Sequence, residues 1–405
     1  MNELAIKRGR GPNWYGQAGA LLFALALFGY PIVGTLNSLL GIEDRVLSVA
    51  FRILVAVLSL FIVAAVGRLH MRRWHILVLL IWFALVLRLS FDTLVAHIDG
   101  VDYALQLFIV GSILPVLALW KLDSYDQLRF ALAGFTAACI GSLSSLLANY
   151  LGAFGEADLT EATGRLSSVS LNAVSLGHLA LSGILCGLVL MRQGSLFKRV
   201  LIATAMVGMF LVMLKTGSKG PVLGLAIALL LWSARRGHGR RLTALAIPAI
   251  AVFALYGDSP ILERIVTVYD DPSTTDRLAL IHDSLQQIVA SPWFGSASVE
   301  LTTGYYPHNI LLEGAMSFGI PLAAVLVAVL AHGLMISWRL LNTDCDLVAL
   351  LFIQALVISQ LSGALFADSL MWFCLITVIC LESRLKPRKV QRHLSSANRS
   401  HPSPI

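Results

Sequence analysis

Runs of about 20 apolar residues recur along the whole chain, and this feature limits the possible folds more than any other, because a helix of that length crosses a hydrocarbon core about 30 Å thick. Charged residues make up only 13% of the 405 residues, whereas a soluble domain has about 25%. The sequence therefore predicts an all-α integral membrane protein. It excludes a soluble enzyme and a disordered chain.

We predict about twelve membrane spans. They lie near residues 18–40, 46–67, 75–93, 103–120, 130–152, 172–191, 200–216, 220–234, 242–256, 308–337, 347–365 and 367–382. The seventh and eighth could instead form one re-entrant hairpin. The first run is long and has no small-residue cleavage site, so we expect a retained span rather than a signal peptide. We find no internal repeat of the kind that builds a transporter from two inverted halves.

The distribution of Lys and Arg predicts the orientation. Alternate loops and both termini hold 22 of these residues on one side, against six on the other. The positive-inside rule then places both termini in the cytoplasm. The expected parts are a cytoplasmic N-terminus (1–17), a bundle of about nine spans (18–256), a large periplasmic loop (257–307), three further spans (308–382) and a basic, disordered cytoplasmic tail (383–405). The positive residues lie between apolar runs, so the net charge of +7 does not indicate nucleic acid. The five cysteines lie in or beside apolar segments, so we expect no disulfides.

The 51-residue periplasmic loop holds seven of the chain's Asp and Glu residues, and residues 275–290 within it have the pattern of an amphipathic helix. Ser273 or Thr274 can cap its start, and Pro292 ends it. The apolar residues predicted to share one face are Leu278, Ile281, Leu285 and Ile288. Long loops with their own secondary structure usually carry function, so we expect this loop to contribute to a site.

Four of the six cations on the outer side, which the positive-inside pattern depletes, lie in the connection between the seventh and eighth spans and in the large loop: Lys215, Lys219, Arg264 and Arg277. An anionic ligand such as pyrophosphate would explain them, because Arg forks and Lys point charges bind phosphate oxygens. Pairing with carboxylates of the loop is the alternative, and the residues alone leave both open. His308 begins a late span and carries the commonest general base. From its position alone, a helix-start residue bonded to loop backbone is the commoner explanation.

Three segments resemble the signature of the O-antigen ligase and polymerase superfamily of bacterial inner membranes. They are PHNILLE at 307–313 followed by FGIP at 318–321, TGSKG at 216–220, and Arg277 followed by PWFG at 292–295. The resemblance is specific across roughly residues 210–330 and architectural before that. Lys219 stands where the family turn more often has Arg, so bidentate phosphate binding is not assured at that position.

The resemblance implies a membrane-embedded glycosyltransferase, type C-like in fold, that needs no metal and no cofactor. Its donor would be an undecaprenyl-diphosphate-linked oligosaccharide in the outer leaflet. His308 would take the proton of the acceptor hydroxyl, and Arg277, with Arg264, Lys215 and Lys219, would stabilise the leaving diphosphate.

Three polar residues beside His308 complete the implied site. Asn309 and Glu313 lie four apart on one helical face and would orient His308 or the acceptor. A structural carboxylate is the alternative for Glu313. Tyr306, like Tyr305, would stack on a sugar ring, although aromatic residues at a membrane interface need no such task.

The leading interpretation is a repeat-unit polymerase, whose acceptor is a second carrier-linked glycan and whose further partner is a chain-length regulator. A ligase that transfers the glycan to lipid A–core is the alternative. A transporter of an anionic lipid or solute is the alternative of another class, with Arg88 and Asp368 on the substrate path.

The charged residues within spans should face the bundle interior, and they are Arg52, Arg88, Asp92 and Asp368. Arg88 and Asp92 lie four apart and can pair with each other. We expect Asp344-Cys345-Asp346 to be a solvated cytoplasmic turn rather than a metal site.

Overall fold

The computed structural model describes residues 13–41, 46–65, 71–120, 126–152, 166, 172–236 and 272–385. Within these ranges every regular element is a helix, and eight helices are long and apolar enough to cross a membrane. The all-helical, membrane-spanning class is thereby confirmed. The count of twelve spans stays a prediction, and the expected ninth span at 242–256 lies outside the described residues.

The eight long apolar helices match predicted spans within a few residues. They are α1 (Asn13–Leu40), α2 (Val46–Ala65), α3 (Arg73–Leu94), the continuous run of α4 (Val101–Gln106), η1 (Leu107–Ile113) and α5 (Leu114–Trp120), α6 (Gln127–Tyr150), α8 (Ala173–Leu190), α9 (Leu196–Lys215) and α14 (Ile310–Leu340). The other helices are α10 (Lys219–Arg236), α13 (Pro272–Ala290), α15 (Asp346–Ser359), α16 (Ser369–Leu381) and the short η2 (Glu382–Leu385). The structure has two helices, α9 and α10, in the stretch of the seventh and eighth predicted spans, and the alternative of one re-entrant hairpin stays a prediction.

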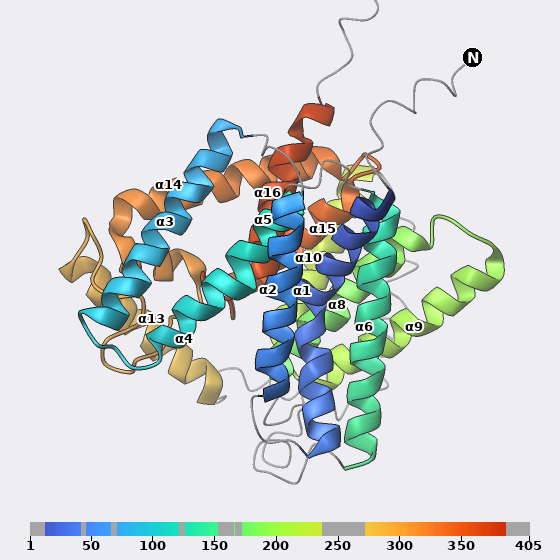
Figure 1. Ribbon diagram of the computed structural model, residues 1–405, viewed down its shortest axis with the longest axis horizontal. Helices are drawn as coiled ribbons and strands as arrows, with labels where there is room; N and C mark the ends of the chain where they lie inside the picture. The colour runs from blue at the N-terminus through green and yellow to red at the C-terminus, as the bar shows by residue number, and fades with distance from the viewer. Residues whose placement is uncertain are drawn as a thin grey trace, which may run out of the picture.

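Burial separates central helices from peripheral ones. Helix α8 is 78% buried along its apolar window, whereas α2 and α9 are only 17% buried. Figure 1 shows α9 leaning away from the bundle formed by α1, α6 and α8, with α3, α13 and α14 on the opposite side. In the same view the start of α1 and the end of α16 lie at the same end of the molecule. The exposed apolar faces of α2 and α9 suit contact with lipid tails, since no water competes there.

The start and the buried face of α13 differ from the predictions, whereas its end at Ala290 agrees with them. The helix begins at Pro272, so Ser273 and Thr274 lie within its first turn and do not cap it. Proline suits that first turn because its missing N–H would have no partner there. The buried face holds Leu280, Ser284 and Ile288, whereas Leu278 and Leu285 of the predicted face are 57% and 47% exposed.

The interpretation of Asp346 as part of a solvated turn is wrong. Its side chain is fully buried and forms an ion pair with Arg192 at 2.6 Å. Gln127 and Trp232 also donate to the same carboxylate, so the first residue of α15 is bonded to α6, to α10 and to the segment after α8. Asp344 is exposed, as predicted. The pairing of Arg88 with Asp92 is confirmed at 2.8 Å.

Candidate functional site

Polar side chains gather around the nine residues between α15 and α16, which we call the 360–368 connection. Arg277 of α13 donates from Nη1 to the Leu361 carbonyl oxygen at 2.8 Å, and Asn309 donates from Nδ2 to the Gln360 carbonyl oxygen at 3.2 Å. The backbone N–H of Leu365 donates to Oε2 of Glu313 at 2.8 Å. Three residues of the sequence signature therefore bind one segment, each to a residue 51 or more positions further along the chain.

This connection was not predicted, because the predicted spans at 347–365 and 367–382 left one residue between them. The structure ends α15 at Ser359 and begins α16 at Ser369. The missed signal was the Ser362-Gly363 pair inside the run, together with Asp368, whose side chain caps α16 by accepting from the backbone N–H of Met371. Serine and glycine favour turns over helix interiors, so they marked a break in the apolar run.

His308 lies in a strained backbone conformation directly before α14. Its φ is +55°, in the left-handed region that few residues other than glycine adopt. The next residue, Asn309, caps α14, because its Oδ1 accepts from the N–H groups of Leu311 and Leu312 at 3.0 and 3.1 Å. The cap and the left-handed turn together fix where the imidazole leaves the backbone.

Aromatic contacts fix the His308 ring further. The Tyr306 ring lies edge-to-face against it, with 4.5 Å between ring centroids, and also against Phe366 of the 360–368 connection at 5.5 Å. Nδ1 of His308 is buried and has no hydrogen-bond partner among the described residues. A buried ring nitrogen without a partner is unusual, and a bound substrate is one means of satisfying it.

The surroundings of His308 favour its neutral form. Burial lowers its pKa to about 4, and the positive charge of Arg277 acts in the same direction. Burial raises the pKa of Tyr306, as does the charge of Glu313, while Arg277 opposes this rise. At neutral pH the site therefore has an uncharged imidazole that can accept a proton, a phenol that can donate one, and a guanidinium cation close to both.

Glu313 holds the 360–368 connection in place. Its side chain is fully buried, and Oε2 accepts from Leu365. Oε1 has no hydrogen-bond partner within the described ranges. The bond to a backbone N–H is the contact expected of the structural alternative for this carboxylate.

Two segments of the sequence signature, at 292–295 and 318–321, pack against each other backbone to backbone. The N–H of Ile320 donates to the Pro292 carbonyl at 2.8 Å, and the N–H of Ser296 donates to the Met316 carbonyl at 2.9 Å. This contact attaches the segment that follows α13 to the kink of α14, where Gly319 interrupts the helical dihedrals. It therefore sets the position of Arg277 relative to His308.

Both glycines of these segments are required by their conformation and their surroundings. Gly295 has a φ of +70° and Gly319 a φ of +82°. A Cβ at Gly295 would lie 2.6 Å from the Phe318 backbone nitrogen, and one at Gly319 would lie 2.7 Å from that of Phe294. Real Cβ atoms do not approach backbone atoms so closely, so only glycine at each position leaves room for the backbone of the other segment.

The predicted cations are placed as follows. Lys215 is exposed at the end of α9, and Lys219 is half-buried at the start of α10. The neighbouring Gly220 faces Leu361, since a Cβ there would lie 3.9 Å from that side chain. The α9–α10 turn thus reaches the connection that also binds Arg277. Arg264 lies outside the described residues, and the convergence of all these cations with His308 in one cavity stays a prediction.

The metal prediction also stays open. Within the part of the chain that the structure describes, no group of three or more His, Cys, Asp or Glu side chains is placed to hold a metal ion. The site as described has an imidazole, a phenol, an amide and a guanidinium around one backbone segment. Such a set can bind an anion, donate hydrogen bonds to hydroxyl groups and accept one proton.

Comparison with known families places a match on this region. Residues 204–327, from α9 to beyond the kink of α14, match the model of the O-antigen ligase family. The match supports the O-antigen ligase and polymerase superfamily that the signature resembles. No curated protein matches the chain.

Proposed function

We propose, from the premise that residues 204–327 form a domain of the O-antigen ligase family, that this protein joins glycans carried on undecaprenyl diphosphate at the periplasmic face of the bacterial inner membrane. The leading form of the proposal is a repeat-unit polymerase. One observation carries it: His308 lies between Tyr306 and Asn309, and both contact the 360–368 connection to which Arg277 is bonded. A neutral base and a cation are thus held side by side.

The proposed reaction is a displacement at the anomeric carbon of the donor sugar. The acceptor hydroxyl oxygen forms the new bond to that carbon, and the bond from the carbon to the diphosphate oxygen breaks. The hydroxyl proton passes to the His308 imidazole, and the bonding electrons leave with the diphosphate. Arg277 and Lys219 would stabilise that charge, and positioned cations are usually among the largest contributors to such catalysis.

The test uses full-length protein purified in detergent, with a carrier-linked oligosaccharide as donor and acceptor, and with EDTA present. We expect elongation by the wild type and a loss of about 10²–10⁴ in rate for His308→Ala. His97→Ala is the matched control, because His97 also has a positive φ, of +53°, but is exposed in the loop after α3. Wild-type turnover by His308→Ala would refute the base, and inhibition by EDTA would refute the metal-free mechanism.

The name of the matched family, O-antigen ligase, favours ligation as a second candidate. The same assay separates the two, because lipid A–core can be offered in place of the second carrier-linked glycan. Transfer to lipid A–core alone would replace the polymerase proposal. A transporter is less well supported, because Arg88 pairs with Asp92, and Asp368 accepts from Ser359 and from the Met371 N–H.

The periplasmic loop would also contact the membrane interface. Its exposed apolar side chains lie on α13 and directly after it, and they are Leu278, Leu285, Val289, Trp293 and Phe294. Trp293 and Phe294 are 70% and 87% exposed although their backbone packs on the kink of a membrane-spanning helix. Aromatic residues favour the membrane interface over water, so this exposed apolar face of α13 would contact lipid. Arg277 of the same helix is bonded to the Leu361 carbonyl oxygen instead.

A further inference from the structure

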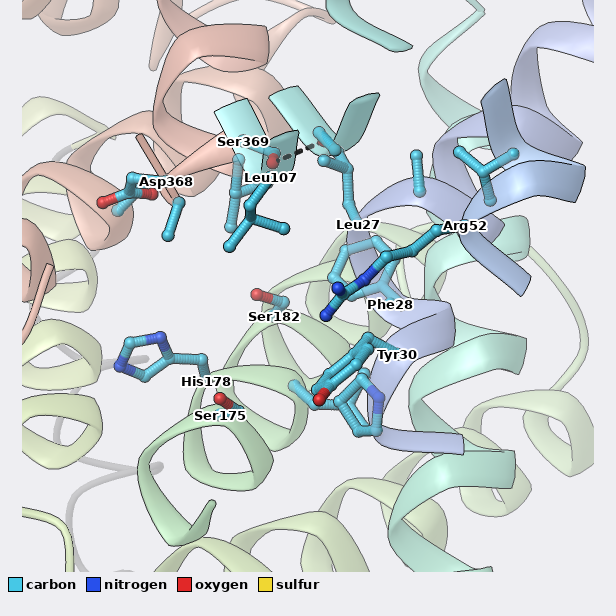
Figure 2. A pocket seen from close by; sticks show the side chains of 18 of the residues that line it. Leu27, Phe28, Tyr30, Arg52, Leu107, Ser175, His178, Ser182, Asp368 and Ser369 are labelled. Atoms are coloured by element: carbon cyan, nitrogen blue, oxygen red, sulfur yellow. Dashed lines mark hydrogen bonds between the residues drawn. The ribbon is translucent and has the colours of Figure 1, made fainter. Parts of the chain in front are cut away.

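A cavity with several polar groups in a mainly apolar wall lies at the α16 end of the 360–368 connection. It has a volume of about 330 Å³, and side chains of α1, α2, η1, α8 and the start of α16 line it (Figure 2). Asp368 and Ser369 reach it from the end of the connection, but His308, Arg277 and Glu313 do not line it. Its size lies near the lower end of small-molecule sites, at about 300–1,000 Å³.

Arg52 of α2 extends its guanidinium into this cavity, as Figure 2 shows. Nη2 donates to the Tyr103 hydroxyl at 2.7 Å, and the guanidinium lies over the rings of Tyr30 and Tyr103 at 5.4 and 5.2 Å. An arginine within a spanning helix is costly unless a partner or water compensates its charge. Aromatic faces and one phenol compensate it only in part.

Other arginines of the bundle have carboxylate partners. Arg88 pairs with Asp92 at 2.8 Å, and Arg192 pairs with Asp346 at 2.6 Å. Arg52 has no carboxylate within ion-pair distance among the described residues. Asp368 lines the same cavity, but Figure 2 places it at the far end, where it accepts from Ser359 and from the Met371 N–H. The cavity therefore has a positive end that a bound anion would neutralise.

Two buried polar atoms of residues that line the cavity have no hydrogen-bond partner among the described residues, and they are Oε1 of Gln354 and Nε2 of His178. The Gln354 side chain is fully buried, and its amide nitrogen donates to the Ser182 hydroxyl. Buried polar atoms are nearly always satisfied, so the ligand should bring hydroxyl groups to these two atoms.

Side chains beside Arg52 are exposed on helices that are long and apolar enough to span the membrane. Tyr30 and Tyr103 are 37% and 40% exposed, and on α2 the neighbouring Val49 and Ile53 are 48% and 57% exposed. These residues belong to spanning helices, so the exposed surface faces lipid. Arg52 is the seventh residue of α2, about 9 Å along the axis from its first residue at 1.5 Å per residue. A lipid headgroup can reach that depth while its tails stay in the bilayer.

We infer that this cavity binds the headgroup of an anionic lipid, with the phosphate on Arg52 and headgroup hydroxyls on His178 and Gln354. The site is separate from the one at His308, and the inference does not depend on the proposed glycosyl transfer. A phosphate could also come from a soluble ester, and the experiment distinguishes these sources.

The test measures binding by titration calorimetry with full-length protein in a non-ionic polyoxyethylene detergent. The probe is short-chain phosphatidylglycerol, which has a phosphate and two headgroup hydroxyls. Glycerol phosphate has the same polar groups without tails, and short-chain phosphatidylcholine has the phosphate with a cation instead of hydroxyls. We expect phosphatidylglycerol to bind at least about tenfold more tightly than either. Phosphatidylcholine lacks the two headgroup hydroxyls, whose hydrogen bonds together contribute about that much. Glycerol phosphate lacks the tails, whose burial against the apolar helix surface stabilises the complex.

Arg52→Gln should weaken phosphatidylglycerol binding about tenfold or more, whereas Arg52→Lys should recover part of the affinity. Arg235→Gln is the matched control, since Arg235 also lies over an aromatic ring, that of Trp338 at 5.6 Å, but does not line the cavity. Ser175→Leu keeps the charge and fills the cavity, so it should also abolish binding. Thermal unfolding shows whether each variant is folded.

Three results would overturn the inference: wild-type affinity for Arg52→Gln or Ser175→Leu, equal affinity for phosphatidylcholine, or equal affinity for glycerol phosphate, which would make the ligand soluble. His308→Ala should bind the probe as the wild type does. If wild-type protein transfers glycan but does not bind the probe, this inference alone is refuted. If His308→Ala binds the probe and also transfers glycan at the wild-type rate, the proposed function alone is refuted.

Discussion

The contact between Gly295 and Gly319 gives the sharpest test of how the site is assembled. We predict that Gly319→Ala detaches the segment after α13 from the kink of α14. The new methyl group would lie 2.7 Å from the Phe294 backbone nitrogen, which cannot move without displacing the segment. Gly295→Ala makes the reciprocal overlap, 2.6 Å from the Phe318 backbone nitrogen.

The magnitude has two contributions. Gly319 has φ +82° and ψ 167°, a backbone region almost confined to glycine, where another residue costs about 1–3 kcal/mol. Overpacking against atoms that cannot rotate away costs about 1–3 kcal/mol more. Gly319→Ala should therefore destabilise the docked segment by roughly 2–6 kcal/mol. The double variant should lose less than the sum, because both substitutions break one contact.

Gly304→Ala is the matched control, because Gly304 has a φ of +72° with nothing within 4 Å of an added Cβ. It should show only the conformational cost. The assay compares thermal unfolding and glycan transfer for the three variants. Gly319→Ala should lower both well below Gly304→Ala, because Arg277 would no longer lie beside His308. Equal melting temperatures and equal turnover for Gly319→Ala and Gly304→Ala would refute the packing argument.

Three further predictions concern the titratable groups of the site, His308 and Glu313. His308→Asn should abolish transfer without unfolding, because Asn tolerates a positive φ, whereas His97→Asn should leave transfer unchanged. The pKa of His308 is lowered to about 4, so kcat/KM should stay level from neutral pH and fall only as pH drops through about 4. Arg277→Gln should move that acid limb to higher pH, because its cation no longer opposes protonation, and an unmoved limb would contradict the assignment. Glu313→Gln should keep the bond from Leu365, whereas Glu313→Leu leaves that buried N–H unpaired and should destabilise the fold by about 1–3 kcal/mol in thermal unfolding.

Helix positions could be predicted because they depend on local apolar length, and Arg88 could be matched with Asp92 because a helix places residues four apart on one face. The rotation of α13 about its axis could not be predicted from the sequence. Apolar spacing assigned Leu278, Leu285 and Ile288 to one face, yet Ile288 is buried with Ser284 whereas Leu278 and Leu285 are exposed. Arg277 of the same helix donates to the Leu361 carbonyl oxygen. This long-range hydrogen bond, donated by the guanidinium of Arg277, cannot be read from the apolar pattern.

Asp346 was misassigned for a related reason. A charged residue next to polar neighbours between two apolar runs usually lies in a solvated loop. Its partners, Arg192, Gln127 and Trp232, come from three segments distant in sequence, and only the tertiary fold brings them together. The same holds for the 360–368 connection, whose relation to His308 depends on how α15 and α16 pack beside α14.

The family match ends at residue 327, yet the bonds that hold its polar residues extend beyond it. Arg277 and Asn309 bind carbonyl oxygens of Leu361 and Gln360, and Glu313 binds a backbone N–H. Backbone atoms are the same for nearly every residue type, so a comparison of side-chain identities has little to detect there.

Because Arg277 and Asn309 bind backbone atoms of the 360–368 connection, we make a last prediction about its side chains. Leu361→Ala and Gln360→Ala keep the carbonyl oxygens that accept from Arg277 and Asn309, so transfer should stay within about threefold of wild type, since removal of a typical neutral contact costs under about 1 kcal/mol. Arg277→Ala removes the cation itself and should cost about 10²–10³ in rate. Steady-state transfer by the three variants, at matched amounts of folded protein, measures the difference. If Leu361→Ala is as inactive as Arg277→Ala, the side chain and not the carbonyl couples the connection to the site.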